Sequence, residues 1–260
     1  MNIVVLLKQT FDTEAKIELT GDGRISSAGV NLIINPYDEY AVEEALRLKE
    51  KFGGEVVIIS LGGSQAQDAI RQALAMGADR GILVQDPALE GADHAGVAQA
   101  LAKAVASVPY DLILSGWVAI DDNAAQVPGR LAEILNLPQV NTVVKLEVDG
   151  NKATAHREGE GATEIIEVAL PAVITAQKGL NEPRYPSMKG IMQARKKEIK
   201  QVTLADLGLT AEAVGAAAAK VKVTSYALPA ARKAGRLLEG EPEDQVKELV
   251  RLLREEAKAI

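Results

Sequence analysis

The sequence predicts an α/β fold, built on a mainly parallel sheet with helices on both faces. Short runs rich in Val, Ile and Leu alternate with longer amphipathic stretches along the first half of the 260-residue chain. Buried parallel strands produce apolar runs of this kind, and strand–helix–strand alternation is typical of a parallel sheet covered on both sides. The strands expected on this basis are residues 3–7, 56–60, 81–84 and 111–115.

Three stretches between these strands have the spacing of amphipathic helices. Residues 40–52 place Ala41, Ala45 and Leu48 on one face, and residues 65–76 and 94–106 show the same three-to-four spacing. A fourth, shorter helix is expected over residues 130–135. The connections are long enough for the crossovers that parallel strands require.

The pattern changes after residue 138. Residues 142–148, 152–156 and 163–168 are closely spaced and strand-like, and Asp149-Gly150 between the first two is a strong hairpin signal. Residues 171–175 form another apolar run. We therefore expect an antiparallel extension joined to the parallel sheet.

The C-terminal part differs from the rest, so we divide the chain into a nucleotide-binding domain at 1–204 and an arm at 205–260. A loop at 179–186 and a basic segment at 189–200 precede the boundary. The arm has an alanine-rich stretch, and a final helix after Glu241 carries one apolar stripe. The stripe is equally compatible with docking on a partner and with folding back on the chain's own domain. The arm's basic residues are Arg232, Lys233 and Arg236, and the stripe is Val246, Leu249, Val250 and Leu253.

Composition excludes several classes of function. The net charge is -7, and the chain has few aromatic residues, which argues against nucleic-acid binding. There is no cysteine, which excludes disulfides, thiol catalysis and iron–sulfur ligation, and the two histidines are too distant in sequence to suggest a zinc site. The chain has neither an apolar run long enough for a membrane span nor a signal-peptide pattern, so we expect a cytoplasmic protein.

Three loops that follow expected strands are candidates for ligand binding, because open α/β sheets bind ligands at the carboxyl ends of their strands. The first, at 35–38, offers Asp38 as a helix N-cap. The second, at 60–64, contains Gly62-Gly63, which lets backbone N–H groups approach a phosphate. The third, at 116–129, is small and polar. Each is equally compatible with an ordinary strand–helix turn.

No catalytic constellation accompanies these loops: there is no Ser-His-Asp set, HExxH motif or paired-acid arrangement. Asp121 and Asp122 together suggest a cation site, but neighbouring side chains seldom point the same way. The residues alone therefore indicate an α/β nucleotide-binding protein without an evident catalytic residue.

Several segments, taken together and in order, resemble the electron transfer flavoprotein β-subunit family. The stretch from Arg157 to the run 171–175 resembles that family's signature, with Ala162 as a departure. Asn181-Glu182-Pro183-Arg184-Tyr185 then leads into a basic run, as in that family. The other matching segments are Val-Val-Leu-Leu-Lys-Gln at 4–9, Asn-Pro-Tyr-Asp-Glu-Tyr-Ala-Val-Glu-Glu-Ala at 35–45, Ala-Leu-Ala-Met-Gly-Ala-Asp-Arg-Gly at 73–81 and Ala-Ile-Asp-Asp at 119–122.

The resemblance implies a doubly wound, Rossmann-like domain that binds an adenine nucleotide, with a C-terminal arm that embraces an α subunit. It implies a heterodimer that relays electrons from acyl-CoA or other dehydrogenases rather than an independent enzyme. The electron-transferring FAD lies on the α subunit, at the boundary with this chain, and this chain holds AMP or, in electron-bifurcating members, a second FAD that oxidises NADH. The implied nucleotide contacts are Leu6, Asn35, Pro36, Tyr37, Asp38, Leu61, Gly62, Gly116, Asp121, Asp122, Asn123, Ala124, Ala125, Gln126, Val127, Pro128 and Gly129.

The same resemblance identifies a loop that anchors partner dehydrogenases. Met188 occupies the position of the apolar anchor, and a flexible thioether suits a docking surface; the alternative is a loop residue packed inward. The residues of this loop are Tyr185, Pro186, Ser187, Met188, Lys189, Gly190 and Ile191.

Two loops favour a second FAD over AMP. The 35–38 and 125–127 segments are similar to those of FAD-type members. Pro128-Gly129 and Trp117-Val118 depart from that type, which usually has Gly-Pro at the first place and a basic residue followed by Gln at the second. The alternatives outside this family are a stand-alone ATP-binding stress-type protein of the same fold, which lacks the part after residue 140, and a ligase or transferase, which needs a Ser- and Gly-rich phosphate loop near the first strand.

Overall fold

The computed structural model describes the whole chain except residues 232 and 233. Arg232 and Lys233 of the arm's basic trio thus lie outside the described residues. The chain forms two compact units: the first comprises Met1–Ile17 and Ser26–Thr224, and the second comprises Glu18–Ile25 and Ser225–Ile260. The candidate site and the α/β fold both belong to the first unit.

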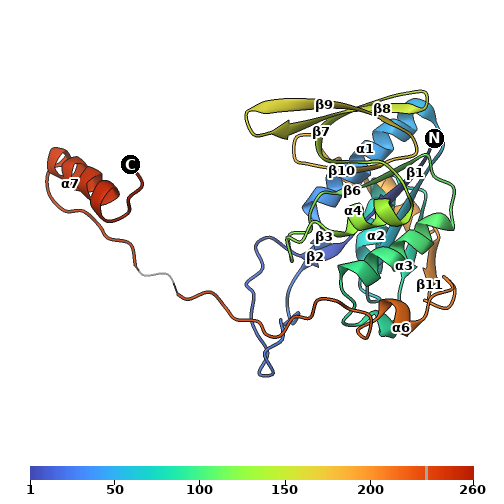
Figure 1. Cartoon of the computed structure of the whole chain (residues 1–260), viewed down its shortest axis with the longest axis horizontal. Helices are drawn as coiled ribbons and strands as arrows, with labels where there is room; N and C mark the ends of the chain where they lie inside the picture. Colours follow the sequence, from blue (N-terminus) through green and yellow to red (C-terminus); the bar gives the residue numbers. More distant parts are fainter. Residues whose placement is uncertain (232–233) are drawn as a thin grey trace. The chain divides into compact units, whose positions relative to one another are not determined.

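The core of the first unit is a sheet of nine strands in the order β11-β5-β4-β1-β6-β10-β7-β8-β9 (Figure 1). All neighbouring pairs from β11 to β7 are parallel, whereas β7, β8 and β9 pair antiparallel. The predicted α/β fold with an antiparallel extension is confirmed. The strands are β1 (Asn2–Leu6), β4 (Glu55–Leu61), β5 (Arg80–Val84), β6 (Leu112–Gly116), β7 (Gln139–Asp149), β8 (Lys152–Gly159), β9 (Ala162–Ala169), β10 (Val173–Ala176) and β11 (Ile199–Val202).

Helices cover both faces of the sheet because successive side chains of each parallel strand point to opposite faces. Ile3 and Val5 of β1 pack in the layer with helices α1 (Pro36–Phe52) and α2 (Ala66–Met76). Val4 and Leu6 pack in the layer with α3 (His94–Ala106) and α4 (Val127–Ile134). The continuous apolar runs in the sequence therefore reflect burial from both sides.

The order of the strands creates a switch point beside β1. The chain runs from β1 through α1 and α2 to β4 and β5 on one side, and then returns through α3 to β6 on the other side of β1. Connections leave β1 and β6 in opposite directions, and ligands of open α/β sheets bind in the crevice that opens there. We refer to this place, at the carboxyl ends of β1, β4 and β6, as the crevice.

Several short elements do not follow from the sequence patterns. The hairpin β2 (Gln9–Phe11) and β3 (Leu32–Ile34) pairs antiparallel between β1 and α1. The expected loop and basic segment contain α5 (Met188–Ala194) and β11, which pairs parallel with β5. The remaining short elements are η1 (Pro87–Leu89) and α6 (Ala211–Val214).

The last helix, α7 (Pro242–Glu255), belongs to the second unit and matches the expected position. Val246, Leu249 and Val250 on its apolar stripe are exposed, and Arg251 pairs with Glu248 and Glu255 along its other side. No helix among the described residues is both long enough and apolar enough to cross a membrane.

Candidate functional site

Asp38 joins three elements at the mouth of the crevice. Its buried carboxylate accepts the backbone N–H of Lys8, after β1, at 2.7 Å, and the backbone N–H of Gly116, at the end of β6, at 2.8 Å. The N-cap expected of Asp38 is wrong, because the helix begins earlier, with Pro36 in its first turn and Asn35 at the N-cap. Burial raises the pKa of Asp38 to about 7, opposed by the two backbone donors, by Asn35 and by the charge of Lys8.

Asn35 fastens the β6 loop to the start of α1. Its side-chain amide donates to the Val118 carbonyl at 2.9 Å, and its side-chain oxygen accepts the Ile120 N–H at 3.2 Å. Its own backbone N–H donates to the carbonyl of Lys8 at 2.9 Å. The predicted residues at 35–38 and the loop after Gly116 are thus brought together by buried hydrogen bonds.

An aromatic pair lines the same place. Tyr37 and Trp117 meet edge to face, with ring centroids 5.6 Å apart. The buried indole Nε1 of Trp117 and the buried Oγ of Ser60, at the end of β4, have no hydrogen-bond partner among the described residues. Buried donors without partners are costly, so they point to a ligand or to ordered water at this edge of the sheet.

Lys8 pairs with both acids of the β6 loop. Its ammonium lies 2.8 Å from Asp121 and 3.1 Å from Asp122. The expectation that these neighbours point in different directions is wrong, because both turn towards Lys8. His94, at the start of α3, adds a contact of 3.1 Å between Nε2 and Asp122.

The pKa values in this cluster follow from these contacts. Burial alone would raise the pKa of Asp122, but the Ala124 N–H, His94 and Lys8 together hold it below its usual value. Burial alone would lower the pKa of Lys8, but Asp121 and Asp122 hold it above its usual value. Asp122 and Lys8 are therefore charged at neutral pH. Among the described residues, no group of three or more His, Cys, Asp or Glu side chains is arranged to hold a metal ion.

The loop after Asp122 is held in an uncommon backbone conformation. Asn123 and Ala125 have φ angles of 51° and 52°. Such angles cost an alanine roughly 1–2 kcal/mol, and strain of this kind concentrates at ligand-binding segments. The loop is shorter than expected, since Val127, Pro128 and Gly129 form the first turn of α4. Gln126 precedes that helix and accepts two hydrogen bonds from Arg130.

The other predicted contacts occupy the neighbouring strand ends. Leu61 ends β4, and Gly62 follows it with its N–H bonded to the Val84 carbonyl at 3.1 Å. Leu6 ends β1 and is buried. The structure adds His94 to this place, and it brings in Lys8, whose sequence signal was its place in the matching segment 4–9.

The chemistry of this crevice fits an adenine nucleotide. The polar loop at 116–126 and the ammonium of Lys8 suit a phosphate and a ribose, and the aromatic pair suits a planar ring. Gly116 allows Asp38 to approach the end of β6 closely, since a Cβ there would lie 2.5 Å from Oδ1 of Asp38.

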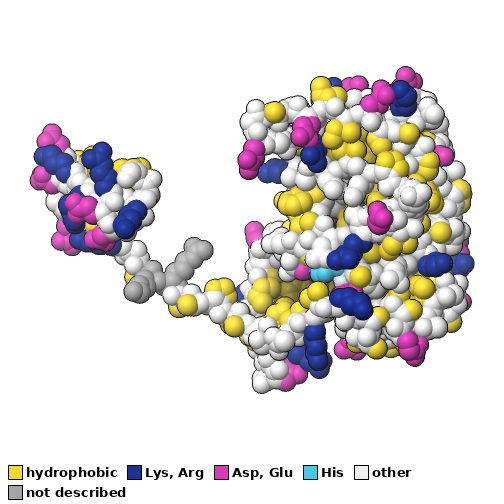
Figure 2. Space-filling model, in the orientation of Figure 1, with side chains coloured by type: hydrophobic (Ala, Val, Ile, Leu, Met, Phe, Trp, Pro, Cys, Tyr) yellow, Lys and Arg dark blue, Asp and Glu magenta, His cyan; other side chains and the backbone are white. Residues whose placement is uncertain are grey.

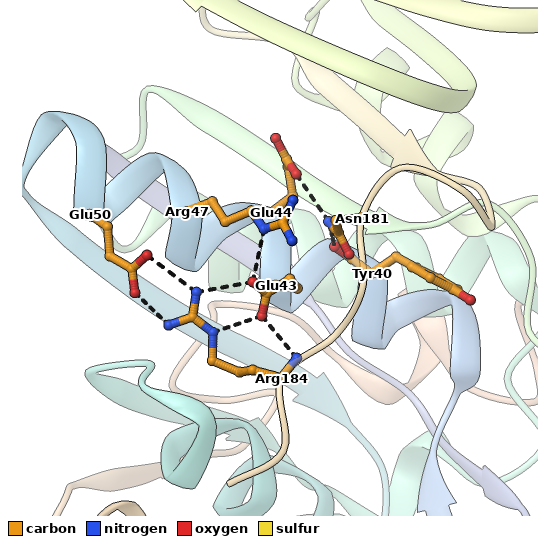
Figure 3. Close-up of polar contacts among 7 residues, drawn as sticks. All are labelled: Tyr40, Glu43, Glu44, Arg47, Glu50, Asn181 and Arg184. Carbon is orange, nitrogen blue, oxygen red and sulfur yellow. Dashed lines mark hydrogen bonds and ion pairs between the residues drawn. The ribbon is translucent and has the colours of Figure 1, made fainter. Parts of the chain in front are cut away.

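A second feature is the clamp that holds the chain before α5 against α1 (Figure 3). Arg184 donates to both oxygens of Glu43, at 2.8 Å from Nε and 3.0 Å from Nη2, and also pairs with Glu50. Glu43 is only 2% exposed and also accepts from Arg47 at 2.9 Å. Burial would raise the pKa of Glu43, but the bonds from Arg184 and Arg47 hold it below its usual value.

Asn181 adds a second attachment of the same loop to α1. Its amide donates to the Tyr40 carbonyl at 2.9 Å and to Glu44 at 3.0 Å (Figure 3). Burial raises the pKa of Glu44, opposed by Asn181. Residues 181–184 are therefore fixed on α1, so the predicted docking residues 185–191 begin at a fixed position beside that helix.

The docking segment itself presents apolar side chains to solvent. Ser187 caps α5 through the Gly190 N–H at 3.0 Å. Tyr185, Met188 and Ile191 are exposed, so the alternative that Met188 packs inward is wrong. The exposed fractions of Tyr185 and Met188, 95% and 76%, distinguish this segment. On the face of the α/β unit that Figure 2 shows, basic, acidic and apolar side chains are mixed.

Gly190 sets how closely α5 approaches α2. A Cβ at this position would lie 2.3 Å from the carbonyl oxygen of Ala75. We expect Gly190→Ala to push α5 off α2 and to lower the free energy of unfolding by about 2 kcal/mol, because overpacking at backbone contacts costs 1–3 kcal/mol. Urea denaturation of this variant and of Gly21→Ala, where a Cβ meets nothing within 4 Å, checks it. Equal stabilities would contradict the close contact.

Comparisons with known proteins agree with this geometry. Residues 22–207 match the electron transfer flavoprotein domain family. The electron transfer flavoprotein subunit beta of Bacillus subtilis is 48% identical over the whole of both chains. That of Syntrophomonas wolfei is 53% identical over 94% of this chain and 92% of its own, and that of Thermoanaerobacterium thermosaccharolyticum is 45% identical over 97% and 98%.

These matches extend through the part after residue 140 that a stand-alone stress-type protein lacks, and they cover the relatives almost completely. They favour the electron-carrier reading over the ATP-binding stress protein and over the ligase or transferase. The nine-stranded fold, the Asp38-centred crevice and these full-length similarities lead to one conclusion: the chain belongs to the electron transfer flavoprotein β-subunit family.

Proposed function

We propose that this chain pairs with an α subunit, as the β half of a heterodimer that relays electrons from dehydrogenases to an acceptor. The electron-transferring FAD lies on the α subunit and this chain completes its wall. The observation that carries the proposal is the membership in the β-subunit family, with similarity over the whole of the chain. The arm at 205–260 docks on the α subunit through the apolar stripe of α7.

The crevice beside β1 holds an adenine nucleotide in this proposal. The loop at 121–126 and Lys8, which pairs with Asp121 and Asp122, lie beside its phosphates, and Asn35 and Asp38 hold the walls in place. We favour a second FAD, as in the electron-bifurcating type, over AMP. The similarity of the 35–38 and 125–127 segments to FAD-type members supports this choice.

A flavin bound there supplies one- and two-electron redox chemistry, including acceptance of a hydride from NADH. This chain's residues bind and orient the nucleotide. Asp38 fixes the β6 loop, and Lys8 supplies a positive charge beside Asp121 and Asp122. Residues 185–191 dock the partner dehydrogenase through Met188, and Arg184 attaches the start of this segment to α1. The chain itself contributes no acid, base or nucleophile.

Cofactor content tests the proposal. The chain is co-expressed with its α subunit, the complex is purified, and released FAD and AMP are quantified. Two FAD and no AMP per heterodimer support the bifurcating type. One FAD and one AMP overturn the second FAD but keep the electron carrier, and ATP without an α subunit overturns the heterodimer.

The substitution Gly116→Ala tests the crevice. A Cβ would lie 2.5 Å from Asp38 Oδ1 and 2.6 Å from the Cβ of Tyr37, so it must displace the loop. We expect the nucleotide held by this chain to fall at least about fivefold while the α-subunit FAD stays, because fitted sites tolerate shifts of about 1 Å poorly. The matched control is Gly21→Ala. Loss of both nucleotides, or of neither, would argue against a crevice site.

A further inference from the structure

The two exposed methionines of α5 lie on one side of a helix whose other side is fixed. Gly190 and Ala194, four residues apart, face α2: Gly190 approaches the Ala75 carbonyl and Ala194 is buried. Arg71 donates to the carbonyls of Ala194 and Lys197, which holds the end of the helix. The helix therefore cannot turn to hide the residues on its opposite side.

Met188 and Met192 occupy that opposite side. They are four residues apart and offset by two positions from Gly190 and Ala194, so they point away from α2. Met188 is 76% exposed and Met192 is 68% exposed, whereas Met76, on α2, is 7% exposed. The chain thus presents two adjacent thioethers to solvent and keeps a third inside.

Methionine is the only sulfur-containing residue type in this chain. There is no cysteine, so peroxide meets no thiolate, which is normally the faster target. A thioether lone pair attacks one peroxide oxygen: an S–O bond forms, the O–O bond breaks, and the second oxygen leaves as water. Sulfur loses two electrons and hydrogen peroxide gains them. The product is a polar sulfoxide, which peptide-methionine sulfoxide reductases return to the thioether.

We propose that Met188 and Met192 form a reversible sulfoxidation site for hydrogen peroxide, and that their oxidation converts the exposed apolar face of α5 into a polar one. Tyr185 and Ile191 are the exposed apolar neighbours in this segment. An apolar docking surface loses its contacts when its thioethers become sulfoxides. The effect on partner docking rests on the function proposed above; the modification itself does not.

The first test maps oxidation residue by residue. The purified protein, in the complex in which it is isolated, is treated with dilute hydrogen peroxide, and peptides are quantified by mass spectrometry over time. Met188 and Met192 should oxidise within about threefold of the rate of a methionine in an unfolded peptide, and Met76 at least about tenfold more slowly, because susceptibility follows exposure. Equal rates at all three positions would overturn the site.

The second test reads the surface directly and needs no partner. Binding of an anilinonaphthalene sulfonate dye should fall at least about twofold on oxidation and recover after reductase treatment, because sulfoxides are polar. The double variant Met188→Leu/Met192→Leu keeps the apolar face without a thioether, so its dye binding should be unchanged by peroxide. Dye binding that falls equally in the variant, or falls in neither protein, would overturn the proposed conversion of the face. A failure of dehydrogenase docking alone would instead count against the function proposed for residues 185–191.

Discussion

Replacing Arg184 by alanine should lower the free energy of unfolding by about 3 kcal/mol, because removing one partner of a buried ion pair leaves a buried charge insufficiently compensated. Glu43 would keep only Arg47 and the backbone N–H of residue 184. Arg184 also holds Glu50, so the loop before α5 would lose its main attachment to α1. Urea denaturation of the full-length chain measures the loss.

A matched control separates burial from charge pairing in general. Arg157 pairs with Glu164 across β8 and β9, where both side chains are substantially exposed. Exposed pairs contribute about 0–1 kcal/mol, so Arg157→Ala should be nearly neutral. Arg184→Lys should recover only part of the loss, because one ammonium cannot replace a guanidinium that bonds both oxygens of Glu43. Equal losses at Arg184 and Arg157 would contradict the clamp.

The pH dependence of this clamp has a definite sign. The folded pKa of Glu43 lies below its ordinary value of 4.5. Its stabilising contribution is therefore present above pH 4.5 and is lost as the pH falls through the folded pKa. The difference in stability between the wild type and Arg184→Ala should narrow as the pH drops below about 4.5. A difference that widens in acid would show that Glu43 is not the charged partner.

The sequence predicts the central sheet well, because β1, β4, β5 and β6 are buried on both faces and each contains a run of Val, Ile or Leu. A strand without that burial has no such run and is not predicted from the sequence. The edge strand β11 reads Ile-Lys-Gln-Val inside a basic segment, and two of its four residues are exposed.

Long-range polar contacts leave no local signature at all. Arg184 and Glu43 are 141 residues apart. Lys8 meets Asp121 and Asp122 across 113 and 114 residues, so the sequence could show the acids but not what turns them in one direction. Asp38 was misassigned for a related reason: its position before the apolar spacing suggested a cap, whereas its true partners are N–H groups at the ends of β1 and β6.

Replacing Asp38 should be the most damaging change at the crevice. Asp38→Ala leaves the N–H groups of Lys8 and Gly116 buried without acceptors, and at about 2 kcal/mol for each we expect a loss of about 4 kcal/mol. Asp38→Asn should lose about 2 kcal/mol, since its amide nitrogen faces one of the two donors. The nucleotide held by the crevice should fall with both variants, as measured by the FAD and AMP released from the complex.

Asp86 provides the matched control, because it also accepts two backbone N–H groups, from Ala88 at 2.9 Å and from Leu204 at 3.1 Å. It is only half-buried, so water can replace the carboxylate, and Asp86→Ala should cost about 1 kcal/mol. Equal losses at the two aspartates would mean that burial of the Asp38 site adds nothing.

Two of the buried carboxylates of α1, Asp38 and Glu43, should respond to pH in opposite directions. Glu43 is matched by Arg184, whereas Asp38 is buried and only weakly influenced by Lys8, so its folded pKa is raised from 3.8 to about 7. The contribution of a group with a raised pKa is present in full below pH 3.8 and is lost as the pH rises through about 7. The advantage of the wild type over Asp38→Asn should therefore shrink between pH 4 and pH 8, measured by urea denaturation across that range. An advantage that grows over the same range would mean that the N–H donors outweigh burial and that Asp38 is fully ionised at neutral pH.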